Sequence, residues 1–434
     1  MFKYMRNGVA VLLFALILGA CAGGTQGGGG TAAAAGDEDV EVVFAWWGNP
    51  VRNEMTYDVL NLFQAEHPRI SVEQHTVGWG EYWSMLATMA AGGNLPDVIQ
   101  MSDAYLHQYW TNDLIIDLQP LMNSGVIDVS DVDPSLIELG RVYDVIPALS
   151  IGINASAMFY NKTLLDSMGI SINHHMTMDD FIQLSRRIYA ESGYKTFFAT
   201  ELILQTMIRA RGAVMFTPEG LGGLPEYYQE FYDILMMGLD EGWIIHPEAL
   251  AGRTGFEESS LFFGSEPAFR TWNYVSWSNL LSAFQAVAPE GMELGMTSRP
   301  SMDPRQGNVV RSSMFLAVTT HSSHPEAAAS IIDFFTNSIE ANEIMLAERG
   351  LPISSVVSEA ILPYMDSAAQ ITHYFVNDVM IPYSSPIDPP NPDGTAAVNN
   401  HMAHVLDMVV HGAMSPADAV REIFDFAEMT FSQN

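Results

Sequence analysis

The chain has 434 residues, of which 48% are hydrophobic and 16% charged, so it is too apolar for a disordered chain and long enough for two or three domains. Acidic residues number 51 and basic residues 18, which gives a net charge of −33. This charge argues against a nucleic-acid partner and, unless a local arginine overrides it, against a strongly anionic ligand. The single cysteine excludes an intrachain disulfide and an all-cysteine metal cluster.

Residues 1–20 have the pattern of a signal peptide. Lys3 and Arg6 form a basic start, and the apolar run that follows is too short to span a bilayer. The letters Leu-Gly-Ala-Cys then end at Cys21 and resemble a bacterial lipobox, in which the cysteine is lipidated. The alternative is an ordinary signal peptide with a chance cysteine near its cleavage site. Residues 21–37, rich in Gly, Ala and Thr, are expected to form a lipidated flexible tether.

The next part of the chain alternates strands and helices. Residues 40–46, 70–77 and 97–101 are apolar or alternating runs that predict three strands, and the segments between them have helical spacing or composition. This order implies a parallel sheet with right-handed crossovers. Ligands of such sheets lie beyond the carboxyl ends of the strands, where this sequence places aromatic and hydrogen-bonding side chains.

Later segments continue the α/β pattern. Residues 314–318 predict a buried strand, and residues 323–326 have the spacing of a capping box that starts a helix. Residues 415–418 predict the start of the last helix in a similar way. The proline-rich residues 382–394 predict a long irregular loop, which makes them a candidate for function.

A series of short motifs makes a resemblance specific. They are Trp46-Trp47-Gly48, residues 63–72 (FQAEHPRISV), residues 86–98 (LATMAAGGNLPDV), residues 113–118 (DLIIDL), Phe159-Tyr160-Asn161-Lys162, residues 261–268, residues 324–328 (HPEAA) and Gly350-Leu351-Pro352. In series, from about residue 40 to 430, they resemble the extracellular solute-binding proteins of ABC transporters. The resemblance is to the sugar-binding group of the maltose-binding type (family 1). Because Met101 stands where that type carries a tryptophan, maltodextrin is not carried over as the ligand.

The resemblance implies two α/β lobes, each a mostly parallel sheet flanked by helices, joined by a three-segment hinge. The implied first lobe holds residues 38–150 and 313–355, and the second holds residues 155–308 and 359–434. The crossings would lie near residues 150–154, 308–312 and 353–358. A sugar would bind in the cleft and the lobes would close over it.

A sugar site needs aromatic rings for the sugar faces and polar side chains that bridge hydroxyls. The family positions and the predicted strand ends imply these ligand-binding candidates: Trp47, Asn49, Arg52, Trp79, Tyr82, Asp103, Asn154, Glu201, Trp272 and Trp277, with Arg311 and Tyr383 as further possibilities. The alternative for Asn49 and Arg52 is capping of the following helix. The structural alternative is preferred for Trp46 in the core, for Asp97 in a turn and for Tyr160 and Asn161 at the start of the second lobe.

Other classes of function are less well supported. The sequence contains no G-x-S-x-G, H-E-x-x-H or Walker motif, and adjacent Glu257 and Glu258 are expected on a solvated helix end. The pairs His174-His175 and His401/His404, with His411, lack an obvious further metal ligand, and the 26 methionines are expected to fill the core. The prediction is therefore a monomeric lipoprotein, outside the cytoplasm, that captures a mono- or oligosaccharide for an ABC permease without a cofactor or chemistry. A peptide- or other solute-binding protein of the same fold is the alternative.

Overall fold

The computed structural model describes residues 39–250, 270–303, 305–389, 391–392 and 394–432, which belong to one compact unit, Asp39–Asn434. The predicted signal peptide, Cys21, the tether, the pair Glu257-Glu258 and the motif at residues 261–268 lie outside the described residues.

The centre of the fold is a seven-stranded sheet with the order β2-β1-β3-β9-β4-β7, and β8 also pairs with β4. Its strands are β1 Val40–Trp47, β2 Ile70–Val77, β3 Val98–Met101, β4 Leu149–Asn161, β7 Asn273–Trp277, β8 Leu294–Thr297 and β9 Val310–Val318. The predicted parallel pairing of the first three strands is confirmed, because β1 lies parallel to both β2 and β3. All other pairs in the sheet are antiparallel, so the α/β fold has a mixed sheet and not the mostly parallel sheet expected in each lobe.

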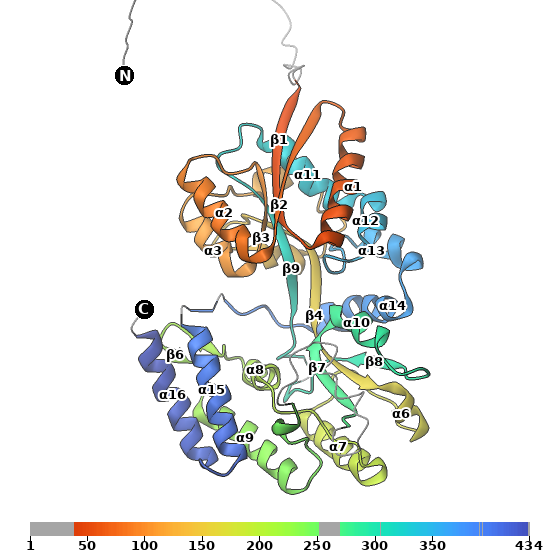
Figure 1. The fold of residues 1–434 in the computed structure, drawn as a ribbon, viewed down its shortest axis with the longest axis vertical. Helices are drawn as coiled ribbons and strands as arrows, with labels where there is room; N and C mark the ends of the chain where they lie inside the picture. Colours follow the sequence, from red (N-terminus) through yellow and green to blue (C-terminus); the bar gives the residue numbers. More distant parts are fainter. Residues whose placement is uncertain (1–38, 251–269, 304, 390, 393, 433–434) are drawn as a thin grey trace, which may run out of the picture. The chain divides into compact units, whose positions relative to one another are not determined.

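Helices surround this sheet, and a small hairpin of β5 Phe216–Thr217 and β6 Gly220–Leu221 stands apart from it (Figure 1). The first helices are α1 Pro50–Glu66, α2 Trp79–Ala91, α3 Asp103–Thr111, α4 Gln119–Asn123, α5 Pro134–Ile137, α6 Lys162–Ser167, α7 Met178–Ser192 and α8 Glu201–Arg209. The others are α9 Pro225–Asp240, α10 Leu281–Ala286, α11 Pro325–Asn337, α12 Ile339–Met345, α13 Ser355–Ile361, α14 Ser367–Tyr374, α15 Thr395–Val410 and α16 Pro416–Phe431.

Two helix N-termini test the capping signals predicted from the sequence. Ser415 accepts a hydrogen bond from the Asp418 backbone N–H at 3.1 Å and caps α16 as predicted. The predicted capping box before α11 does not form, because His324 occupies the N-cap position and makes no side-chain cap bond. Pro325 at the first position still favours this helix start, since its missing N–H would have no partner there.

The described residues bury two hydrophobic cores. The first packs α1, α2 and α11 against β1, β3 and β9, and the second is formed mainly by α7, α8, α9, α15 and α16. Strand β4 contributes to both, because Phe159 belongs to the first core and its neighbour Met158 to the second. Residues 361–380, which the sequence places in the second lobe, also supply the first core. The long strand β4 therefore connects the two cores.

The pairing of β4 with β9 is irregular at one place. Its register shifts around Gly152, where the hydroxyls of Ser150 and Ser312 lie 2.8 Å apart. A Cβ on Gly152 would lie 2.1 Å from the backbone oxygen of Arg349, so only glycine permits this approach of the chain. On β4 the irregular segment lies within residues 150–154, a predicted hinge crossing; on β9 it spans residues 312–315 and so meets the predicted crossing at residues 308–312 only at Ser312.

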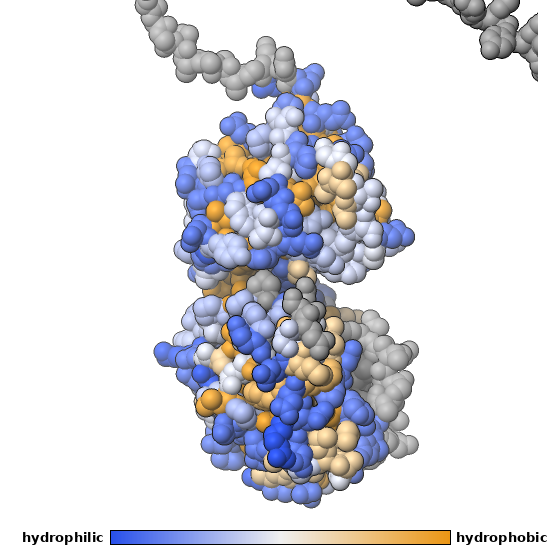
Figure 2. Space-filling view, turned by 90° about the vertical axis from the view of Figure 1, so that its left-hand side faces the viewer, coloured by the Kyte–Doolittle hydropathy of each residue, from blue (hydrophilic) through white to orange (hydrophobic). Residues whose placement is uncertain are grey.

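Hydrophilic residues cover most of the face seen in Figure 2, and hydrophobic residues there form scattered patches. No helix among the described residues is long and apolar enough to cross a membrane.

Candidate functional site

Aromatic side chains gather beyond the carboxyl ends of β1, β2 and β3. The aromatic cluster consists of Trp47, Trp79, Trp83 and Tyr105. The ring centroids of Trp47 and Trp79 are 4.9 Å apart, and Trp83 stacks on Tyr105 at 3.7 Å. Trp79 is 49% exposed, whereas Trp47 is 8% exposed. The cluster therefore presents an aromatic surface at the edge of the sheet where parallel sheets bind ligands.

Sequence reasoning found Trp47 and Trp79 but missed the two partners that complete the cluster. Trp83 lies one helical turn after Trp79 on α2, and Tyr105 lies in the first turn of α3. The four-residue spacing of two tryptophans was the available signal, since residues four apart share a helix face. The buried Nε1 of Trp83 has no hydrogen-bond partner among the described residues.

Tyr82 packs against Trp47 and Trp83 of the aromatic cluster and does not face a ligand. Its side chain is completely buried, and its hydroxyl donates to the backbone oxygens of Ala45 (3.0 Å) and Gln100 (2.9 Å). Burial raises the pKa of Tyr82 well above its ordinary value, so the hydroxyl stays protonated. Because no surface of Tyr82 is open to a ligand, we do not keep it among the site residues.

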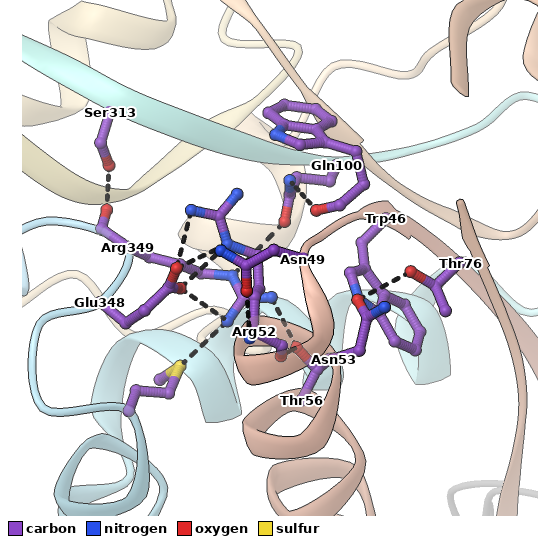
Figure 3. A network of polar contacts seen from close by, with 12 residues as sticks. Trp46, Asn49, Arg52, Asn53, Thr56, Thr76, Gln100, Ser313, Glu348 and Arg349 are labelled. Atoms are coloured by element: carbon purple, nitrogen blue, oxygen red, sulfur yellow. Dashed lines mark hydrogen bonds and ion pairs between the residues drawn. The ribbon is translucent and has the colours of Figure 1, made fainter. Parts of the chain in front are cut away.

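A polar network holds the end of β1 in place (Figure 3). Trp46, which is fully buried as predicted, donates from Nε1 to Asn53 at 2.9 Å, and Gln100 donates to the backbone oxygen of Trp47 at 3.3 Å. Arg349 donates hydrogen bonds to Gln100 (3.4 Å) and Thr56 (2.6 Å), so the network joins the segment after α12 to β3 and α1.

Asn49 and Arg52 have partners within this network. Asn49 accepts a hydrogen bond from the Arg52 backbone N–H at 2.9 Å and caps α1, which is the structural alternative given for it. The guanidinium of Arg52 forms a 2.9 Å ion pair with Glu348 (Figure 3). Asp97 is also structural, since its carboxylate accepts from the Val43 backbone N–H at 2.8 Å.

A second set of candidate residues meets where β4 lies between β9 and β7. Asn154 is opposite Arg311 in the register of β4 and β9, and Ser156 is opposite Trp277 in the register of β4 and β7. The Arg311 guanidinium carbon lies 3.9 Å from the centroid of the Trp277 ring, and that of Arg299 lies 4.7 Å from it. We call Trp277, Arg299 and Arg311 the arginine–tryptophan group.

Arg299 is buried and Arg311 is partly buried, and both remain charged. Burial lowers the pKa of Arg299 to about 9, and the charges of Arg311 and Arg209 act in the same direction. Burial also lowers the pKa of Arg311, while the nearby carboxylate of Asp103 opposes the shift. A guanidinium with a pKa of about 9 remains protonated at neutral pH.

Asp103 thus connects the two sets of residues. It is the first residue of α3, and its carboxylate accepts from the Ala104 backbone N–H at 2.9 Å. Its charge acts on Arg311, and α3 also carries Tyr105 of the aromatic cluster. The structure therefore brings together Trp47, Trp79, Asp103, Asn154, Trp277 and Arg311 of the predicted residues, as two neighbouring sets.

Three other predicted residues lie apart from these sets. Trp272 is fully buried in the second core, where its Nε1 donates to Thr196 at 2.8 Å, so we do not keep it in the site. Glu201 begins α8 and accepts a hydrogen bond from Asn399 of α15 at 3.3 Å. Tyr383 contacts His175 and Arg305 in the proline-rich loop region.

The histidines considered as metal ligands have other contacts. His401 stacks on Phe426 with centroids 3.9 Å apart, and His411 lies 2.5 Å from Glu248. His174 lies 3.2 Å from the Thr297 hydroxyl. Among the residues that the structure describes, no group of three or more His, Cys, Asp or Glu side chains is placed to hold a metal ion.

Comparison with known proteins identifies the family. The family model described as bacterial extracellular solute-binding protein matches residues 40–341. The chain belongs to this family. The family is one of solute-binding transport proteins and is not an enzyme family. The resemblance found in the sequence motifs is thereby confirmed.

Solved structures of other solute-binding proteins share the two-lobe fold. A family 1 extracellular solute-binding protein from Alicyclobacillus acidocaldarius is 19% identical, with a TM-score of 0.82 over 92% of this chain and 100% of its own. A periplasmic oligogalacturonide-binding protein from Yersinia enterocolitica is 18% identical, with a TM-score of 0.72 over 91% and 99%. The GacH receptor of Streptomyces glaucescens, solved with and without acarbose, is 17% identical, with a TM-score of 0.64 over 91% and 99%.

Proposed function

We propose that this solute-binding protein captures a mono- or oligosaccharide outside the cytoplasm and delivers it to an ABC permease, without chemistry of its own. The observation that carries this proposal is the aromatic cluster, with Trp79 half exposed beside polar groups at the carboxyl ends of parallel strands. A rigid aromatic surface gains apolar contact with the C–H face of a sugar ring and loses few rotamers. Two of the similar structures are named for saccharide ligands, oligogalacturonide and acarbose, which supports the same ligand class.

Polar residues beside the cluster complete the proposed site. Asp103 is exposed, and Asn154 lies in β4 opposite Arg311. Carboxylate, amide and guanidinium groups each make two hydrogen bonds to neighbouring hydroxyls, which ring stacking alone does not supply. We assign the aromatic rings the contact with the sugar faces, and Asp103, Asn154 and Arg311 the contact with its hydroxyl edges.

The proposed capture step is closure of two lobes. The first lobe would hold residues 38–150 and 313–355, and the second residues 155–308 and 359–434. The continuous strands β4 and β9 and the register shift at Gly152 support a hinge at residues 150–154 and 308–312, because irregular pairing loosens a strand pair locally. The third crossing would lie at residues 353–358.

Alanine at Trp79 tests the ligand assignment. Saccharides are first screened by thermal unfolding of the full-length protein, because a ligand at 100 times its dissociation constant stabilises by about 2.7 kcal/mol. With the best saccharide, Trp79→Ala should weaken binding about 10- to 100-fold, the equivalent of losing the burial of one large apolar side chain. Since Trp79 is 49% exposed, its own contribution to folding is small. Isothermal titration calorimetry measures the dissociation constants.

Tyr364→Ala is the matched control, because Tyr364 is also an exposed aromatic residue, at 61%, and lies outside the aromatic cluster. It should bind the saccharide like the unchanged protein. Normal binding by both Trp79→Ala and Trp83→Ala would remove the aromatic cluster from the site. Stabilisation by a peptide, with no response to any saccharide, would overturn the ligand class and leave the fold in place.

We further propose that Cys21 carries the lipid anchor that holds the mature protein at the outer face of a membrane. The supporting observation is the position of the single cysteine of the chain directly after an apolar run and two small residues. Two acyl chains on one cysteine suffice for stable attachment. In a bacterial host, Cys21→Ser should move the protein from the membrane fraction to the soluble fraction, as measured by fractionation and blotting. Retention of the variant in the membrane after cleavage would contradict the anchor.

A further inference from the structure

The structure gathers positive charge at one place in a strongly acidic protein. Arg209, Arg299 and Arg311 lie close enough that the charges of Arg209 and Arg311 act on Arg299. They are three of only 18 basic residues in a chain of net charge −33. Arg209 forms an ion pair with Asp388, but among the described residues neither Arg299 nor Arg311 has a carboxylate within ion-pair distance.

Arg299 is the more deeply buried of the two. It is 1% exposed, and one of its nitrogens donates to the backbone oxygen of Ser276 at 2.7 Å. Its buried Nε has no hydrogen-bond partner among the described residues. A charged group that leaves water without an anion or a full set of hydrogen bonds is unfavourable, so such a position normally has an anion beside it.

The guanidinium N–H groups of Arg311 have no acceptor among the described residues. The structure shows no hydrogen bond from its guanidinium to any described residue, and its buried Nε has no partner there. Its contact with the ring of Trp277 restrains the side chain on β9, while the N–H donors lie along the edge of the guanidinium plane. A restrained guanidinium binds a carboxylate, sulfate or phosphate with two parallel hydrogen bonds.

The neighbourhood places this charge beside the proposed sugar site. Helix α3, which carries Asp103 and Tyr105 of the aromatic cluster, contacts β9, the strand that carries Arg311. The carboxylate of Asp103 also acts electrostatically on Arg311. Asn154 lies opposite Arg311 in the sheet. A ligand that stacks on the aromatic cluster and carries an anionic group would match both sets of residues.

We propose that the arginine–tryptophan group binds an anionic oxygen group carried by the saccharide, so that the ligand is an acidic sugar. This inference rests on the proposed function. The anionic group is the carboxylate of a uronic acid or a sulfate or phosphate ester, which share the geometry that a guanidinium recognises. Arg311 makes the direct contact, and Arg299, which lies beside the same Trp277 ring, adds positive charge without needing its own contact with the ligand.

The test compares acidic and neutral saccharides of the same length on the full-length protein by calorimetry. The pairs are digalacturonate with a neutral galactose disaccharide, glucuronate with glucose, and sulfated or phosphorylated galactose with galactose; free sulfate and phosphate are included. At least one acidic member should bind about 30-fold or more tightly than its neutral partner, as expected for a desolvated charge pair. Which pair responds distinguishes carboxylate from sulfate and phosphate.

Arg311→Gln should remove this preference, with a loss of about 30-fold or more for the acidic saccharide and a smaller loss for the neutral one, which gives up only hydroxyl contacts. Arg311→Lys keeps the charge without the two-pronged donor geometry and should lose less. The control is Arg187→Gln, because Arg187 is an exposed arginine on α7 that pairs with Glu191 at 2.9 Å. Its binding should match that of the unchanged protein, and thermal unfolding checks that each variant is folded.

Equal or tighter binding of the neutral partners, or an equal effect of Arg311→Gln on both members of a pair, would overturn the inference while the proposed function stands. Free sulfate or phosphate that binds as tightly as the acidic saccharide would also overturn it, because the sugar would then add nothing. No binding of any saccharide, acidic or neutral, would instead be the failure of the proposed function.

Discussion

Arg349→Ala should lower the free energy of unfolding by about 2–4 kcal/mol, because it leaves a cavity and removes buried hydrogen bonds. Arg349 is 2% exposed, donates to Thr56 at 2.6 Å and reaches Gln100 at 3.4 Å. Burial lowers the pKa of Arg349 to about 9, which leaves it charged at neutral pH. Urea unfolding of the full-length protein, followed by circular dichroism, measures the change.

Two further variants separate the causes. Arg349→Met retains most of the volume without the charge and should cost less than Arg349→Ala, since replacing a buried charge by an apolar side chain recovers its desolvation. Arg52→Ala removes the ion pair with Glu348, whose side chains are 16% and 20% exposed, and should cost less than Arg349→Ala, because both charges keep some contact with water. Equal stability of Arg349→Ala and the unchanged protein would show that the network of Figure 3 does not stabilise the first core.

Trp272→Ala should destabilise the protein by about 3–5 kcal/mol, the usual cost of truncating a buried tryptophan. Trp272 is fully buried, lies 5.8 Å from Phe181 between ring centroids and donates to the hydroxyl of Thr196. The loss should be visible as a large fall in the midpoint of urea unfolding. Trp79→Ala is the comparison, because its half-exposed ring should cost little stability and much ligand affinity.

Trp272→Phe decides between a core role and a site role. Phenylalanine fills most of the cavity, so this variant should stay folded and bind the saccharide like the unchanged protein, with only the hydrogen bond to Thr196 lost. Weaker saccharide binding by folded Trp272→Phe would return Trp272 to the ligand site.

Local patterns in the sequence identified much of the site's framework. The first three strands, their parallel order and the tryptophans at their ends follow from apolar runs and helical spacing between residues close in the chain. The family followed from motifs in series, and the matched residues 40–341 agree with it. The spacing at residues 323–326 correctly predicted the start of α11, but its capping box does not form, because the helix begins at Pro325 with His324 in the N-cap position.

The sequence did not predict which tryptophan side chains are buried. Trp79 and Trp272 are the same residue type, but one is 49% exposed and the other 0%. The difference in burial depends on which elements pack over each ring. Trp272 contacts Phe181 and Thr196, and Thr196 lies 76 positions away along the chain. Local periodicity carries no information on such coverage.

The charge of the site likewise has one part that the sequence predicts and one part that only the fold determines. The net charge of −33 follows from composition and argues against an anionic ligand, whereas the fold brings Arg299 and Arg311 to one tryptophan without a described carboxylate partner for either. Composition, secondary-structure order and family motifs can be predicted from the sequence, because they depend on residue identity and on short spacings along the chain. Which charges meet depends on the path of the chain, as when Arg52 pairs with Glu348 across 296 positions. Electrostatic and packing energies depend on distance in space, and only the folded chain sets that distance.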